Sequence, residues 1–293
     1  MIEMKLLNDY SEVLSYNFEH FPINTKKAIL SDYPNMSAIN HWHNDWEFTI
    51  ILKGEMYYSI NGKDYLLKEG QAVFVNSAQM HYGHSFEKSD CTFIYIVLNP
   101  LLFTNIDKIK DSYIIPICDD KSHPFFIFDS YISWQKDFIE SLIEIYKLCT
   151  ELKETFELEV MSKFYWICSS LYKNLKNDKL NKEIYCNKNL DSLRNMVGYI
   201  QKNYKNKITL NEIASSGNVC RSNCCKIFQS ILNTSPISYL LEYRLDKSIK
   251  LLHESSYSIT EIALKCGFNS SSYYTESFRK IIGCSPSEYR KSL

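Results

Sequence analysis

The spacing of hydrophobic residues along the chain changes once, from a strand-like to a helix-like period. Between Lys26 and Leu98 the apolar residues fall in short runs rich in aromatic and β-branched residues, which is typical of strands. The runs cover residues 46–52, 55–60, 63–67 and 71–75. Gly54 and the pair Asn61-Gly62 separate some of them, and Asn61-Gly62 predicts a tight hairpin because both residues tolerate a positive φ. Several short strands at this spacing indicate an all-β sandwich or barrel.

From residue 133 onward the apolar residues recur every three or four positions, which predicts two amphipathic helices. Their stripes consist of Phe138, Leu142, Ile145, Tyr146 and Cys149, and then Val160, Met161, Phe164, Ile167, Cys168, Leu171 and Leu175. Such stripes need a covering surface, which the β segment, the other helix or a second subunit would supply. The segment therefore either packs on the β domain or forms a dimer contact. Residues 173–189 follow with many Lys, Asn and Asp, as expected of a linker.

The last third of the chain contains a weak internal repeat. The residues that recur are Glu212-Ile213-Ala214 as Glu261-Ile262-Ala263, 49 residues later, and Phe228, Ser235-Pro236 and Tyr239 as Phe278, Ser285-Pro286 and Tyr289, 50 residues later. Each copy predicts a helix, a turn and a second helix, with Asn218 and Gly267 at the aligned turn positions. Both residue types accept a left-handed backbone. A helix-turn-helix unit uses such a joint to place its second helix in the major groove of DNA.

Each second helix of the repeat would have a polar outward face and an apolar inward face. The outward positions hold Arg221, Ser222, Asn223, Cys225, Lys226 and Gln229, and then Ser270, Ser271, Ser272, Tyr273, Glu276 and Arg279. The inward positions hold Cys224, Ile227, Phe228 and Ile231, and then Tyr274, Ser277, Phe278 and Ile281. Arg and Lys can bond guanine, Asn and Gln adenine, and Glu cytosine, each good pair giving ~1–3 kcal/mol of discrimination. For either helix alone, a solvated face is the alternative.

The distribution of charge favours DNA as the partner of this repeat. The 293 residues carry a net charge of -1, yet residues 1–180 hold 17 Lys and Arg against 25 Asp and Glu, whereas residues 181–293 hold 16 against 9. The chain thus joins an acidic part to a basic part, and the basic part is expected to meet an anion such as nucleic acid. No apolar run reaches the ~18–20 residues of a membrane span, and the N-terminus lacks the apolar core of a signal peptide. The sequence therefore predicts a cytoplasmic protein without membrane contact.

Motifs in roughly the last hundred residues match a known pattern. They are Ile208-Thr-Leu-Asn-Glu-Ile-Ala214, Phe228, Ser235-Pro236, Arg244-Leu245, Ile259-Thr-Glu-Ile-Ala263, Cys266-Gly267-Phe268, Phe278-Arg279-Lys280 and Tyr289-Arg290. Together they closely resemble the DNA-binding domain of the AraC/XylS family of transcription regulators. The resemblance implies seven helices, with one long helix at about residues 236–253 between two helix-turn-helix units, and RNA polymerase as a partner. It also implies DNA contacts at Arg221, Ser222, Cys225, Lys226, Ser271, Ser272, Tyr273 and Glu276.

Three residues depart from the family pattern. Cys220 and Cys224 stand where the family usually has a Ser cap and an inward Leu, so the first unit should be somewhat less stable, since a lost cap costs ~0.5–2 kcal/mol. Glu276 stands where the family often has Arg or Lys. Either Glu276 reads a cytosine or the second unit binds DNA weakly.

A histidine-rich motif lies in the β segment. His41-Trp-His43-Asn-Asp-Trp-Glu47, followed by Gly54 and by His81, resembles the first cupin motif, and residues 70–81 resemble a loose second one. On an extended strand His41, His43, Asp45, Glu47 and Thr49 would share one face, and Trp42 and Trp46 would point to the opposite face as packing residues. His41, His43, Glu47 and His81 could bind Zn, Fe, Mn or Ni. A metal-free pocket for a small effector, or a purely structural cluster, would use the same residues.

The sequence thus predicts an α+β multidomain protein. A cupin-like β-barrel for effector binding would occupy residues 1–132, a helical dimerisation segment 133–176, a linker 177–189, and an all-α domain with two helix-turn-helix units 190–293. The predicted function is a sequence-specific transcription regulator that binds double-stranded DNA, forms a homodimer and senses a small effector, a carbohydrate or another metabolite. No cofactor is expected unless the barrel holds a divalent metal. The alternative is a metal-dependent cupin enzyme with an accessory DNA-binding domain.

Overall fold

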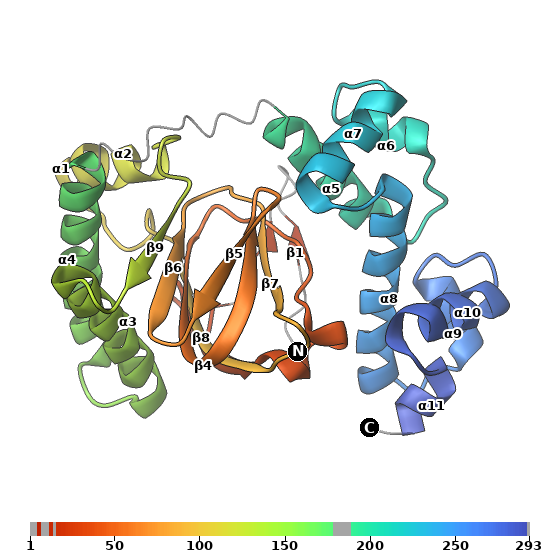
Figure 1. Ribbon diagram of the computed structural model, residues 1–293, viewed down its shortest axis with the longest axis horizontal. Coiled ribbons are helices and arrows are strands. Elements are labelled where there is room, and N and C mark those ends of the chain that lie inside the picture. Colours follow the sequence, from red (N-terminus) through yellow and green to blue (C-terminus); the bar gives the residue numbers. More distant parts are fainter. Residues whose placement is uncertain (1–4, 7–11, 14–15, 178–188, 292–293) are drawn as a thin grey trace. The chain divides into compact units, whose positions relative to one another are not determined.

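Two compact units make up the described part of the chain (Figure 1). The computed structural model describes residues 5–6, 12–13, 16–177 and 189–291. Residues 13 and 16–177 belong to a β-rich unit that ends in helices, and residues 5–6, 12 and 189–291 belong to a second, mainly helical unit. Most of the predicted linker, residues 177–189, lies outside the described residues. Among the described helices, none combines the length and the apolarity that crossing a membrane would require.

The β-rich unit is built on antiparallel strands. The short strands β1 (Lys5–Leu6) and β2 (Glu12–Val13) form a separate two-stranded sheet that is not part of the main sheet of this unit. The main sheet contains β3 (Ile23–Ile29), β4 (Trp46–Ile60), β5 (Lys63–Lys68), β6 (Gln71–Val75), β7 (His81–Ser85), β8 (Cys91–Leu98) and β9 (Phe125–Asp129). Its order is β3-β8-β4-β6-β9, and β5 and β7 also pair with β4. The short helical segments between strands are η1 (Leu30–Asp32), η2 (Pro34–Met36), α1 (Asp107–Ile109), η3 (Lys110–Ile114) and α2 (Ile115–Cys118).

Strand β4 is the centre of the sheet, and it is one strand where the sequence pattern predicted two. The expectation that Gly54 would end a strand was wrong. The pairing with β8 shifts register between Ile51 and Lys53, which is a bulge that bends the strand. Gly54 follows with φ +81°, and a methyl group there would lie 2.5 Å from the carbonyl oxygen of Asp90. Before the bend β4 pairs with β6, beyond it with β5 and β7, and its pairing with β8 continues through the shift as far as Gly54. The Asn61-Gly62 hairpin is confirmed, with φ of 50° and 84°.

Helices α3 (Ser133–Glu151) and α4 (Phe156–Asn177) pack against each other and on the sheet (Figure 1). The rings of Phe138 and Phe128 stack with centroids 4.2 Å apart, and Trp46 lies 5.5 Å from Phe74 and 6.4 Å from Phe164. The predicted apolar stripes of both helices therefore belong to the core of this chain. A dimer contact, if these helices form one, must use their other faces.

The helical unit has seven helices in its described residues, as the family resemblance implied. They are α5 (Leu190–Asn203), α6 (Leu210–Ser216), α7 (Arg221–Leu232), α8 (Pro236–Glu254), α9 (Ile259–Lys265), α10 (Ser271–Ile282) and α11 (Pro286–Lys291). The two helix-turn-helix units are α6–α7 and α9–α10, and α8 connects them. The turn residues Asn218 and Gly267 have φ of 54° and 82°, so the predicted left-handed turns are confirmed.

The first helix of each unit starts with the same device, which explains part of the repeat. Thr209 and Glu212 form a capping box at α6, and Ser258 and Glu261 form one at α9. In each box the hydroxyl accepts from the backbone N–H of the Glu, and the Glu carboxylate accepts from the backbone N–H of the cap. The recurring Glu-Ile-Ala motif thus combines a cap with two buried positions.

Candidate functional sites

The outward face of α7 carries the predicted polar residues. Arg221, Ser222, Asn223, Lys226 and Gln229 are exposed, and Cys225 is half-buried. The inward residues of this helix, which are Cys224, Ile227, Phe228 and Ile231, are all buried in the structure. The helix therefore holds its polar face in place with an apolar face that packs in the unit. Whether these polar side chains contact DNA stays a prediction.

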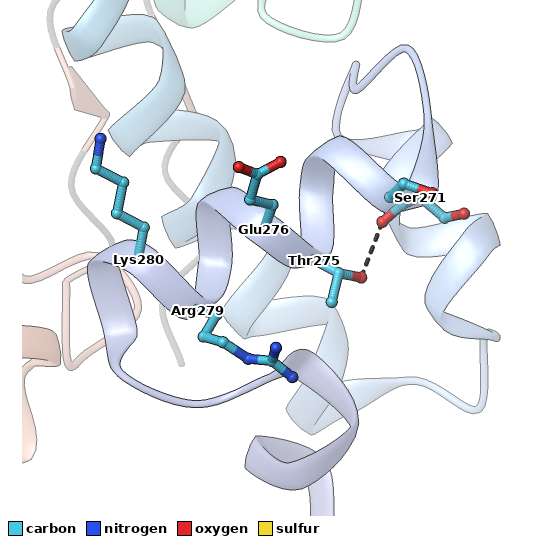
Figure 2. A pocket seen from close by; sticks show the side chains of 6 residues that line it. Ser271, Thr275, Glu276, Arg279 and Lys280 are labelled. Atoms are coloured by element: carbon cyan, nitrogen blue, oxygen red, sulfur yellow. Dashed lines mark hydrogen bonds between the residues drawn. The ribbon is translucent and has the colours of Figure 1, made fainter.

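The outward face of α10 has the same construction and is slightly hollowed. A depression of about 670 Å³ lies along it, lined by Ser271, Ser272, Thr275, Glu276, Arg279 and Lys280 (Figure 2). Glu276 is the one acid in this lining, beside two cations. The inward residues Tyr274, Ser277 and Phe278 are buried, and Ile281 is partly buried.

Sequence reasoning missed Thr275 and Lys280 on this face. Thr275 Oγ1 donates to the carbonyl oxygen of Ser271 at 2.8 Å, one turn earlier on the helix. The spacing of four from Ser271 to Thr275 and on to Arg279 could have identified it, because residues four apart lie on the same face of a helix. Ser270 was predicted among the outward residues, and it is the N-cap of α10.

The second helices of the two helix-turn-helix units, α7 and α10, begin differently. The Ser270 hydroxyl accepts from the backbone N–H of Tyr273 at 3.2 Å, which caps α10. The residue at the corresponding position of α7 is Cys220, and its side chain makes no capping hydrogen bond. The weaker cap expected for the first unit is therefore present in the structure.

Arg244, in the middle of α8, contacts both the loop before α6 and the second helix-turn-helix unit. Its Nε donates to the carbonyl oxygen of Tyr204 and its Nη2 to that of Asn206, both at 2.8 Å. The guanidinium also lies 6.0 Å from the ring centroid of Phe268, directly after the turn of the second unit. Burial lowers the pKa of Arg244 from its usual value. Arg244 therefore connects α8 both to the segment between α5 and α6 and to the residue that follows the turn of the second unit.

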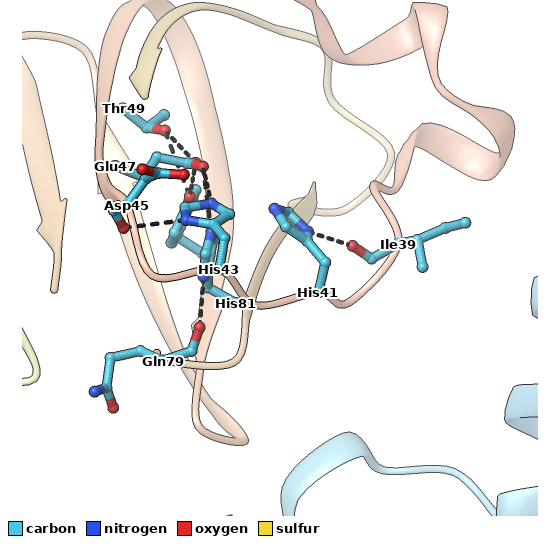
Figure 3. A network of polar contacts seen from close by, with 9 residues as sticks. Ile39, His41, His43, Asp45, Glu47, Thr49, Gln79 and His81 are labelled. Atoms are coloured by element: carbon cyan, nitrogen blue, oxygen red, sulfur yellow. Dashed lines mark hydrogen bonds and ion pairs between the residues drawn. The ribbon is translucent and has the colours of Figure 1, made fainter. Parts of the chain in front are cut away.

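The second site is the histidine cluster in the β-rich unit. His41, His43, Glu47 and His81 each offer one ligand atom, and these four atoms all lie within 4.8 Å of one another (Figure 3). The Oε2 atom of Glu47 lies 3.3 Å from His43 Nε2 and 3.2 Å from His81 Nε2. Glu47, His43 and His81 are buried, and His41 is partly exposed. The structure therefore brings together all four predicted residues.

The cluster is assembled differently from the extended strand that the sequence predicted. Strand β4 begins only at Trp46, and the segment before it joins β7 through an isolated bridge between His41 and His81. Asp45, which was expected on the same face, points to another partner, because its carboxylate accepts from the Tyr16 hydroxyl at 3.1 Å. The prediction was thus wrong for Asp45. It was correct for Trp42 and Trp46, which are both buried.

The neighbouring histidines determine the protonation state of Glu47. Burial alone would raise the pKa of this carboxyl, but His81 and His43 lower it, so that the pKa of Glu47 lies well below its usual value. Desolvation lowers the pKa of His41 to about 3, and the neighbouring His81 adds to this effect. Burial and the charge of Glu47 raise the pKa of Tyr58, whose hydroxyl donates to Glu47 Oε1 at 2.5 Å. The site therefore combines a carboxylate with a neutral His41 imidazole.

Comparisons with known proteins cover both units. The family profile described as AraC-like ligand binding domain matches residues 28–123, and the profile described as Helix-turn-helix domain matches residues 213–292. The first range contains the histidine cluster, and the second contains α7 and α10.

Two transcription regulators are similar to this chain over most of its length. The chain is 28% identical to the uncharacterized HTH-type transcriptional regulator YdeC of Bacillus subtilis, over 96% of this chain and 95% of that protein. It is 24% identical to the melibiose operon regulatory protein of Escherichia coli, over 88% of this chain and 85% of that protein. Among solved structures, an apo variant of ToxT from Vibrio cholerae covers 95% of this chain and 100% of its own, with a TM-score of 0.52 and 16% identity, which shows a similar fold.

Proposed function

The chain belongs to the AraC/XylS family of DNA-binding transcription regulators with an N-terminal ligand-binding domain, and from this premise we propose how its two units divide the work. Helices α7 and α10 read DNA in the cytoplasm, and the β-rich unit binds a small effector at His41, His43, Glu47 and His81. The observation that carries the DNA proposal is the duplicated geometry. Two capped helices and two left-handed turns each hold a second helix with an exposed polar face.

The length of α8 supports simultaneous contact by both units. A helix of 19 residues is about 28 Å long, which is comparable with the ~34 Å between successive major-groove segments on one face of a duplex. On α7, Arg221 and Lys226 would contact phosphate or guanine. On α10, Arg279 and Lys280 would make the same kinds of contact one helical turn further along the DNA. Glu276 would either accept a hydrogen bond from a cytosine amino group or weaken the binding of α10 to DNA.

The effector proposed for the β-rich unit is a carbohydrate or another small polar metabolite. The buried groups available to it are polar, since Thr49, Tyr58 and Glu47 surround the histidines. A relative named for a melibiose operon supports the carbohydrate class. We also propose a second copy of the chain and RNA polymerase as partners. The apolar residues Leu158 and Trp166 of α4, which are 70% and 41% exposed, offer a surface for the second copy.

The experiment for the DNA proposal measures the affinity of the full chain for DNA from upstream of its own gene at several salt concentrations. We expect Arg221→Ala and Lys226→Ala each to weaken binding and to flatten the plot of log K against log salt by ~0.9 for each phosphate that the variant no longer neutralises. Lys202→Ala is the matched control, because Lys202 is an exposed cation on α5 and belongs to neither α7 nor α10. Equal affinities and equal slopes for all four proteins would refute the assignment of α7.

A further inference from the structure

Short side chains line part of the depression on α10. Ser271, Ser272 and Thr275 end in hydroxyl or methyl groups, and three longer charged side chains complete the lining (Figure 2). Thr275 is half-buried among them. Side chains this short reach a base edge only if the helix itself lies deep in the major groove, whose width of ~12 Å admits an α-helix. The depression therefore suits close contact between α10 and the bases.

The hydroxyl of Thr275 is already engaged within the helix. Its Oγ1 donates to the carbonyl oxygen of Ser271 at 2.8 Å (Figure 2). A threonine hydroxyl has a single proton, so Thr275 cannot also donate to an acceptor on a base. The bond fixes the rotamer as well, because Oγ1 and the methyl carbon occupy different staggered positions on Cβ and only Oγ1 faces the Ser271 carbonyl. The methyl group is the part of Thr275 that remains for a partner in the depression.

A methyl group in the major groove identifies one base. Thymine presents its C5 methyl group there, whereas guanine, adenine and cytosine carry no methyl group at that edge. The methyl group of a threonine side chain makes a suitable apolar contact with it. Removing one methyl group from water is worth about fourfold in affinity, which is enough to favour a thymine at one position of a binding site.

The corresponding position of α7 has a different side chain. Thr275 lies four residues after Ser271, the first residue of α10, and Cys225 lies four residues after Arg221, the first residue of α7. Cys225 is half-buried like Thr275, but it has no methyl group. The two helix-turn-helix units therefore differ at equivalent positions, and a methyl contact at this position is specific to α10.

We propose that Thr275 is a specificity-determining residue that reads a thymine through its side-chain methyl group. The inference rests on the proposed function, because it requires α10 to lie in the major groove of DNA. It adds one base-reading residue to those that the family resemblance implies, and it specifies the base. Ser271 acts as the positioning residue, since its carbonyl oxygen holds the hydroxyl of Thr275.

The test compares two versions of the DNA from upstream of the chain's own gene, one with thymidine and one with deoxyuridine throughout. Deoxyuridine lacks only the C5 methyl group and still pairs with adenine. The affinity for both is measured for the full chain, for Thr275→Ser, which loses the methyl group and keeps the hydroxyl, and for Thr275→Val, which does the reverse. We expect the ratio of the two affinities to be about fourfold smaller for Thr275→Ser than for the unmodified chain, and unchanged for Thr275→Val.

Thr260→Ser is the matched control. Thr260 is exposed on α9 and belongs to neither α7 nor α10, so the loss of its methyl group should leave the ratio unchanged. Any effect of deoxyuridine on the shape of the DNA is common to all the proteins and cancels in the comparison. Far-UV circular dichroism checks that each variant folds.

The outcomes separate this proposal from the proposed function. Equal ratios for Thr275→Ser and the unmodified chain would overturn the reading of thymine while DNA binding itself stands. Equal reductions of the ratio in Thr275→Ser and Thr275→Val would also overturn it, because the hydroxyl would then be the group that matters. If the folded, unmodified chain binds neither DNA, the proposed function fails and this inference fails with it.

Discussion

Replacing Gly267 tests whether the turn of the second helix-turn-helix unit depends on close backbone packing. Gly267 has φ +82°, and a methyl group there would lie 2.3 Å from the carbonyl oxygen of Tyr204 and 3.0 Å from two backbone atoms of Lys205. The Tyr204 carbonyl cannot simply move away, because it accepts from Arg244 Nε at 2.8 Å. Gly267→Ala therefore combines a strained φ with a steric overlap against fixed backbone.

Gly283 provides the control that separates the two effects. It has φ +92° at the end of α10, and nothing lies within 4 Å of the position that a methyl group would take. Gly283→Ala should cost only the left-handed strain of ~1–2 kcal/mol. Gly267→Ala should cost this strain and a further ~1–3 kcal/mol for the overlap. The gain from a less flexible unfolded chain is similar for both variants and cancels in the comparison.

The assay uses the distribution of tryptophan in the chain. All four tryptophans, Trp42, Trp46, Trp134 and Trp166, lie in the β-rich unit, so fluorescence during urea unfolding reports on that unit. Far-UV circular dichroism reports mainly on helices and so includes the helical unit. We expect both variants to unfold earlier by circular dichroism, Gly267→Ala by ~1–3 kcal/mol more than Gly283→Ala, with an unchanged fluorescence transition. Equal losses in the two variants would show that the contact with Tyr204 does not constrain the turn.

Two further predictions use the same measurements. Cys220→Ser should stabilise the helical unit by ~0.5–2 kcal/mol, because Cys220 has extended N-cap geometry without a side-chain cap, and Ser270→Ala should lose a similar amount at α10; no gain from Cys220→Ser in the circular dichroism transition would contradict the capping argument. Phe138→Ala should lower the stability of the β-rich unit by ~3–5 kcal/mol, because Phe138 is fully buried and stacks on Phe128. A fluorescence transition that moves by less than ~1 kcal/mol would show that the stripe of α3 is not part of the core.

The helical unit could be predicted closely from the sequence because its determinants are local. Pro236 follows the cap Ser235 and starts α8, and Asn218 and Gly267 adopt the left-handed turns that their residue types suggested. Helical hydrogen bonds, caps and turn residues act within about four positions, so a short window of sequence contains the information. The inward residues of α7 followed from the same periodicity.

The sheet and the histidine cluster were harder to predict from the sequence. Gly54 resembled the end of a strand, and only the register between β4 and β8 shows that it follows a bulge inside one strand. The motif suggested all four members of the cluster, but the assumption of an extended strand also placed Asp45 on their face. The side chain of Asp45 instead meets Tyr16, 29 residues earlier in the chain. Contacts of this kind depend on topology, which residue spacing does not encode.

The sequence by itself determined the order of the two units, the helix-turn-helix repeat and the polar faces of α7 and α10, because periodicity and caps are properties of neighbouring residues. The tertiary structure alone decided that the stripes of α3 and α4 are covered by the sheet within one chain. It also decided that His81 approaches Glu47 from 34 residues away, with Tyr58 behind the carboxylate. Burial and ligand geometry arise where distant segments meet, so they appear only once the chain has folded.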